Sequence, residues 1–136
     1  MTDREEALTA RSEIHSLLQE LYAARVRSDL DGLCRIFSTE ATFRIAGISR
    51  HVSPIAVMAV GINEIRQWLT LLLKTFQIND QEIIAMIVEK NRAAVHWRAK
   101  IYSRISGITV PTALVDLVEV RDGHVVSYTE FLAPCR

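Results

Sequence analysis

Two acidic side chains near the end of the chain have the types and spacing that acid–base chemistry requires. Asp116 and Glu130 each lie within an apolar segment, and the Asp122-Gly123 pair between the segments is typical of a tight hairpin turn. On a buried face of two neighbouring strands, desolvation and mutual repulsion would raise the pKa of at least one of these acids. A carboxylic acid beside a carboxylate is the pair that proton transfer near neutral pH needs, so we predict that both residues are catalytic.

Alternation along the strands adds two aromatic residues to this candidate site. Tyr128 lies two residues before Glu130 on the same face, and we predict that its phenol donates a hydrogen bond to a substrate oxygen. Trp97 lies on the apolar face of an earlier strand, where it either packs in the core or shapes a ligand. A structural alternative stays open, in which Asp116 or Glu130 pairs with a nearby Arg or His and only tethers the sheet.

The composition and the remaining patterns argue against several other functions. Sixteen basic and sixteen acidic side chains balance, with no Lys/Arg block, which disfavours nucleic-acid binding. We expect neither a metal nor a cofactor, because no His, Asp or Glu pair has ligand spacing and the five glycines build no phosphate loop. The charged N-terminus lacks the apolar run of a signal peptide, and no segment is long enough for a membrane span. These features predict a cytoplasmic protein without membrane contact.

Hydrophobic periodicity predicts three helices in the first half of the chain. Apolar residues at three- and four-residue intervals predict a first helix over about residues 3–27. Ser28-Asp29 supplies capping side chains for a shorter second helix that runs from Leu30 through Phe37. Gly61 and Asn63 mark the start of a third helix with a broad apolar face.

The second half of the chain has the patterns of β-strands. A short strand is predicted at residues 41–45, and residues 50–60 are either an irregular strand or a lid. Four longer strands are predicted at residues 78–89, 92–105, 108–120 and 125–132. Their very short turns make consecutive strands antiparallel neighbours. We therefore predict a single α+β domain over residues 1–136, in which a curved antiparallel sheet wraps around about three N-terminal helices and an internal pocket.

Three segments carry a family resemblance. They are residues 21–37 (LYAARVRSDLDGLCRIF), residues 61–65 (GINEI) and residues 115–131 (VDLVEVRDGHVVSYTEF). Together they resemble the SnoaL-like branch of the nuclear-transport-factor-two-like superfamily, whose fold is cone-shaped. The superfamily includes ketosteroid isomerases, polyketide cyclases, scytalone dehydratases and epoxide hydrolases, besides members that only bind or only dimerise, so the resemblance implies a fold and not one reaction.

The resemblance also implies positions within the pocket. Asp116 falls where ketosteroid isomerases keep the protonated Asp of an oxyanion hole. The position of their general-base Asp is Ile45 here, and that of their oxyanion Tyr is Leu21, with Tyr22 one residue out of phase. Steroid isomerisation by that mechanism is therefore not expected, and no pair of pocket histidines can be placed as in scytalone dehydratases. The side chains that the resemblance implies around a ligand are Leu21, Phe43, Ile45, Trp97, Leu114, Val118 and Leu132.

These observations predict a protein that binds a small hydrophobic molecule in an internal pocket. Its catalytic form would be a cofactor-free isomerase, cyclase or dehydratase that uses Asp116 and Glu130. The alternatives are a non-catalytic ligand-binding module and a dimeric interaction module whose cavity is filled by its own side chains. The resemblance further implies a homodimer through the outer face of the sheet, where the basic row of His96, Arg98 and Lys100 either pairs with Glu119 across a two-fold axis or is solvated.

Overall fold

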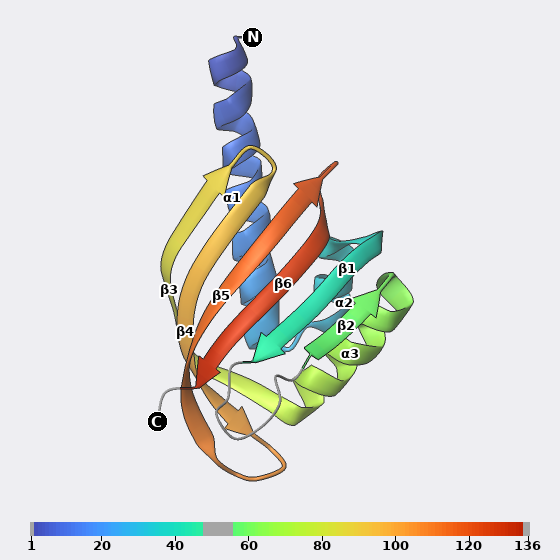
Figure 1. The fold of residues 1–136 in the computed structure, drawn as a ribbon, viewed down its shortest axis with the longest axis vertical. Helices are drawn as coiled ribbons and strands as arrows, with labels where there is room; N and C mark the ends of the chain where they lie inside the picture. The colour runs from blue at the N-terminus through green and yellow to red at the C-terminus, as the bar shows by residue number, and fades with distance from the viewer. Residues whose placement is uncertain (1, 48–55, 135–136) are drawn as a thin grey trace.

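The first helix of the computed structural model, which describes residues 2–47 and 56–134, runs along the concave side of the sheet (Figure 1). Helix α1 (Asp3–Arg27) begins at a capping box, because the Thr2 hydroxyl accepts from the Glu5 N–H while the Glu5 carboxylate accepts from the Thr2 N–H. It ends at Ser28, which is in the left-handed conformation at φ 57°. The predicted helix over residues 3–27 is confirmed.

Two shorter helices complete the helical layer. Helix α2 (Leu30–Ile36) starts at Asp29, whose carboxylate accepts a hydrogen bond of 2.9 Å from the Gly32 N–H. Helix α3 (Ile62–Thr75) starts at Gly61, where φ is 85°, and packs Ile65 and Leu69 into the core. Figure 1 shows α3 lying beside strands β1 and β2, and its last residue, Thr75, leads directly into β3.

Six strands form one sheet in the order β2-β1-β6-β5-β4-β3. Their bounds are β1 Phe37–Gly47, β2 Ala56–Val60, β3 Phe76–Glu89, β4 Arg92–Ser103, β5 Thr109–Arg121 and β6 His124–Pro134. The pairs from β3 to β6 are antiparallel neighbours along the chain, as predicted. The α+β architecture of three helices and a curved sheet is thereby confirmed, and it positions β5 and β6 at the centre of the concave face.

The structure differs from the sequence prediction around β1. Phe37 was assigned to the second helix but begins β1, and the strand is longer than the predicted residues 41–45. The sheet is also not wholly antiparallel, since β1 runs parallel to β6. Of the segment 50–60, residues 56–60 form strand β2, whereas residues 50–55 and the question of a lid lie outside the described residues.

The core lies between the concave face of the sheet and α1. Inward side chains alternate with outward ones along β4 and β5, so that every second residue from Ala93 to Ala99 and from Thr112 to Val120 is buried. The core-facing side of α1 contributes Ile14, Leu18, Leu21 and Tyr22. Burying polar side chains here is costly unless they find partners, and Asp116 and Glu130 are the two acids in this core.

Candidate functional site

Asp116 is the centre of a buried hydrogen-bonded cluster. It lies on β5 with none of its surface exposed. Its Oδ2 atom accepts from three donors, which are the phenol of Tyr22 at 2.5 Å, the indole Nε1 of Trp97 at 2.7 Å and the phenol of Tyr128 at 2.5 Å. The other oxygen, Oδ1, is buried with no hydrogen-bond partner among the described residues. One oxygen is thus fully satisfied, and the second is free to interact with something else.

Glu130 lies directly opposite Asp116 across the β5–β6 hairpin and has an ionic partner. Arg25, from the last turn of α1, contacts the Glu130 carboxylate through Nη1 and donates from Nη2 to Oε1 at 3.3 Å. The Arg25 guanidinium also lies over the Trp97 ring, 5.0 Å from its centroid. The Arg partner of the structural alternative left open by the sequence is therefore present for Glu130.

Tyr128 connects the two carboxyl groups. The Tyr128 oxygen accepts a hydrogen bond of 2.9 Å from Arg25 Nη1. The single phenol proton is then left for one of the two carboxyl groups. The Tyr128 phenol oxygen lies 2.5 Å from Asp116 Oδ2 and 3.1 Å from Glu130 Oε2. Tyr128 thus donates mainly to Asp116, where the sequence analysis assigned its proton to a substrate oxygen.

Charge balance in this cluster separates the two acids. Burial and the nearby Glu130 charge raise the pKa of Asp116 well above its usual value. Burial alone would also raise the pKa of Glu130, but the Arg25 charge and hydrogen bonds outweigh it and lower that pKa. Because one cation faces two carboxyl groups, these shifts favour an ionised Glu130 beside a protonated Asp116. The predicted split of one acid and one carboxylate matches these shifts.

The apolar side chains predicted around a ligand lie on the same concave face. Trp97, Leu21 and Leu114 are at most 1% exposed, and Phe43 stacks on Tyr128 with 5.6 Å between ring centroids. Val118 and Ile45 are also buried, whereas Leu132 is only partly buried. These residues surround the polar cluster, and their role as ligand contacts stays a prediction.

Access to the cluster is limited to one side chain. Arg25 keeps 17% of its side-chain surface exposed, whereas Glu130 keeps 3% and Asp116 none. Beyond the cluster, the inward residues Ile101 and Leu132 are partly buried. A molecule that reaches Asp116 must therefore displace side chains that now pack against the acid.

Two members of the cluster were missed in the sequence analysis. Tyr22 was considered one residue out of phase, but it is 1% exposed and bonds Asp116 directly. Arg25 was not considered at all. Both follow from helix geometry, because positions 18, 21, 22 and 25 form one stripe along α1. An Arg within an apolar stripe needs a buried acid as its partner, and this was the available signal.

The outer face of the sheet carries the charged row named from the sequence. Arg98 pairs with Glu82 at 2.6 Å and Lys100 with Asp80 at 3.5 Å, both within the chain. Glu119, which was expected to face a basic row across a two-fold axis, lies 3.8 Å from Arg121 of its own chain. These charges are therefore balanced locally.

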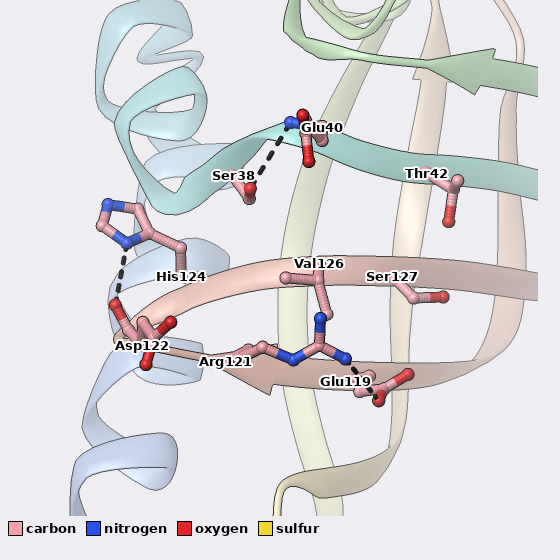
Figure 2. A pocket seen from close by; sticks show the side chains of 9 residues that line it. All are labelled: Ser38, Glu40, Thr42, Glu119, Arg121, Asp122, His124, Val126 and Ser127. Carbon is pink, nitrogen blue, oxygen red and sulfur yellow. Dashed lines mark hydrogen bonds and ion pairs between the residues drawn. The ribbon is translucent and has the colours of Figure 1, made fainter.

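Two hollows lie on this outer face. The first, of about 620 Å³, opens beside the β5–β6 turn where the β1–β6 pairing shifts register, as Figure 2 shows. It is lined mostly by polar side chains, among them Glu40, Asp122 and His124. The second, of about 470 Å³, adjoins the first and contains Ile87 and Leu117. Neither contains a residue of the buried cluster.

Comparison with models of protein families identifies the family of this chain. A SnoaL-like domain model matches residues 18–128, which is most of the sequence. The chain belongs to the SnoaL-like family. Solved structures agree on the fold, although comparison with curated protein sequences gives no match. An NTF2-like protein from Burkholderia xenovorans superposes with a TM-score of 0.75 at 20% identity, over 90% of this chain and 91% of that one.

Two further structures show how widely this SnoaL-like fold is used. A protein of Catenulispora acidiphila with a ketosteroid isomerase-like fold, in complex with trimethylamine, has a TM-score of 0.68 at 13% identity over 84% and 82% of the chains. An LEH-like epoxide hydrolase of M. tuberculosis has a TM-score of 0.70 at 11% identity over 90% and 84%. Such low identities establish the common fold alone.

Two searches of the described residues bear on other functions. No group of three or more His, Cys, Asp or Glu side chains there could hold a metal ion. None of the helices in the described part of the chain is both long and apolar enough to cross a membrane.

Proposed function

We propose that this SnoaL-like protein binds a small hydrophobic molecule and transfers protons on it without a cofactor, with Asp116 as the acid and Glu130 as the base. The single observation that carries the proposal is the pair of adjacent buried carboxyl groups whose pKa values are driven apart. Opposite shifts in neighbouring titratable groups are the arrangement from which acid and base roles follow. Isomerisation, cyclisation and dehydration all need such a pair.

The unpartnered Oδ1 of Asp116 indicates what the ligand must offer. A protonated carboxyl group with its second oxygen held by three donors has a proton left to donate from Oδ1. Its partner would be a carbonyl, hydroxyl or epoxide oxygen on an otherwise apolar molecule. The surrounding aromatic and aliphatic side chains favour a ring or short hydrocarbon chain. Arg25, as the exposed member of the cluster, would move aside when this molecule enters.

Proton exchange on a model ketone tests the acid–base proposal without knowledge of the natural substrate. We would incubate the protein with 2-tetralone in D₂O and follow the loss of the α-proton signals by NMR. An acid–base pair that polarises the carbonyl and removes an α-proton raises the exchange rate above that of buffer. Asp116→Asn and Glu130→Gln should each lower that increase by about 100-fold.

A matched control uses an acid on the opposite face of β5. Glu119→Gln removes a carboxylate from the same strand but leaves the cluster intact, so exchange should stay at the wild-type rate. If quenching of Trp fluorescence shows that the ketone is bound but exchange stays at the buffer rate, the catalytic proposal is refuted. The protein would then be a ligand-binding module without catalysis. If 2-tetralone, cyclohex-2-enone and 1-decalone all failed to bind, the pocket itself would be refuted.

We also propose that two copies associate through the outer face of the sheet. The observation that favours this is a group of large apolar side chains left open to solvent there, with Ile87 66% and Leu117 48% exposed. Val115 and Phe131 lie beside them in paired positions of β5 and β6. Contiguous apolar surface of this kind is typical of protein interfaces. Leu117→Lys should convert a dimer into a monomer by light scattering, and a wild-type monomer would refute the association.

A further inference from the structure

The two outer hollows form one trough that crosses the sheet. They share Glu119 and Ser127, so they are continuous. Along the trough the strand registers produce two parallel rows. One row runs from Glu89 through the paired positions to Glu119 and Ser127, and the next contains Ile87 and Leu117. The trough is therefore apolar along the second row, whereas the first row carries Glu89 and Glu119 with Arg92 between them.

The trough as a whole carries an excess of negative charge. Its carboxylates are Glu89 and Glu119, with Glu40 and Asp122 at the β1 end. The cations that line the same trough are Arg92 and Arg121, with His124 near the turn. The four carboxylates outnumber the two guanidinium groups by two, so two more positive charges would neutralise the trough.

The N-terminal part of α1 has the complementary pattern. Every residue from Asp3 to Glu13 is exposed, and Figure 1 shows this arm projecting past the edge of the sheet. Arg4, Leu8 and Arg11 fall on one face of the arm at intervals of four and three residues. Leu8 is 53% exposed on that face. Glu6 and Glu13 lie on the opposite face of the helix, and Asp3 and Glu5 flank the Arg4–Leu8–Arg11 face on either side.

The arm has little to hold it in place. The packed part of α1 nucleates the helix, but each exposed residue beyond it adds little stability and the end of a helix frays readily. Among the described residues no ion pair is formed along the arm, and its side-chain hydrogen bonds are those of the Thr2–Glu5 capping box and of the Thr9 hydroxyl to the Glu5 carbonyl. A surface that holds the Arg4–Leu8–Arg11 face would stabilise it.

We propose that the exposed arm of α1 from a second copy of this chain lies across the outer trough, with Leu8 on the second, apolar row and Arg4 and Arg11 on the first row. The dimensions agree. The arm of eleven residues is about 16 Å long at about 1.5 Å per residue. The trough spans β3 to β1, which is four strand spacings of about 4.8 Å, or about 19 Å. This inference rests on the proposed outer-face association and specifies which part of the partner fills it.

Charge reversal on the arm tests the inference directly. Arg4→Glu together with Arg11→Glu should weaken the dimer by at least about tenfold, measured by light scattering over a concentration series, because two ion pairs become repulsive contacts. Glu6→Arg with Glu13→Arg is the matched control, since it changes two charges on the opposite face of the same helix. That control should leave the dimer mass unchanged. Circular dichroism checks that each variant keeps its helix content.

A mixing experiment provides the rescue. Glu89→Arg with Glu119→Arg reverses the trough while leaving the arm intact, and this variant alone should also be monomeric. Mixed in equal amounts with the arm variant, it should restore a dimer, because each altered arm then meets an altered trough of opposite charge.

The outcomes separate the two proposals. A dimer that resists arm reversal but dissociates with Leu117→Lys overturns the arm contact and keeps the outer-face association. A wild-type monomer overturns both. Restoration of the dimer only in the mixture, with both variants monomeric alone, supports the arm contact.

Discussion

Asp116→Asn offers a sharp test of the proton that the buried cluster holds. In the unfolded chain an Asp with a pKa of about 3.9 is ionised near pH 7, whereas in the fold burial and the Glu130 charge raise the pKa of Asp116 and favour its protonated form. Folding therefore takes up one proton. A raised pKa gives stability that is complete below about pH 4 and is lost as the pH rises toward the folded pKa.

The expected magnitude follows from this single proton. The free energy of unfolding of the wild type should lose about 1.4 kcal/mol per pH unit through Asp116 above about pH 4. Asparagine has nearly the same shape and does not titrate, so this contribution is absent from the variant. Subtracting the wild-type curve from the variant curve cancels the other titrating groups. The difference should rise by about 1.4 kcal/mol per pH unit from about pH 5 up to the pKa of Asp116 in the fold.

Urea denaturation at several pH values measures both curves. Parallel curves would show that Asp116 is ionised in the fold, and that the three donors on Oδ2 outweigh burial and the Glu130 charge. The reasoning that assigns acid and base roles would then be refuted at its first step. An infrared carboxylic-acid band that disappears in the variant provides an independent readout.

Three further substitutions probe the supports of the site by urea denaturation. Arg25→Met leaves Glu130 buried without a counter-ion and should cost about 3–5 kcal/mol, most of which Glu130→Gln in the same chain should recover; additive losses would contradict the pairing. Tyr22→Phe removes one of the donors to Asp116 and should cost about 1 kcal/mol, so an unchanged midpoint would argue against that hydrogen bond. Asp29→Ala removes the cap of α2 and should cost about 1 kcal/mol, whereas Asp31→Ala, at an exposed ion pair, should cost less; equal losses would count against capping.

The sequence was sufficient for elements whose signals are local. The β5–β6 turn is an example, because Asp122 and Gly123 have φ values of 52° and 75°, the left-handed conformations that an Asp-Gly turn supplies. Continued without a break, the register of this turn would set Asp116 opposite Thr129, and the shift between Glu119 and Val120 sets it opposite Glu130 instead. The local pattern therefore predicted the hairpin and its inward acids, whereas their direct pairing depends on an irregularity that the pattern does not signal.

Features that depend on distant contacts were harder to predict. Phe37 continues a helical spacing, yet pairing with Val125 of β6 makes it a strand residue. Nothing near Phe37 in the sequence signals that parallel pairing. Tyr22 and Arg25 were within reach of helix periodicity, but assigning the phase of α1 from a resemblance left Tyr22 out. Which acid holds the proton depends on Arg25, so it could not be settled from β5 and β6 alone.

The parallel contact between β1 and β6 has a consequence for synthesis of the protein in the cell. Strand β6 lies between β1 and β5 and is synthesised after both of them. Until β6 leaves the ribosome, β1 and β5 each have an unpaired edge. Open edges readily pair with other chains. Premature stop codons ahead of β6 should therefore produce aggregates and no partly active fragment.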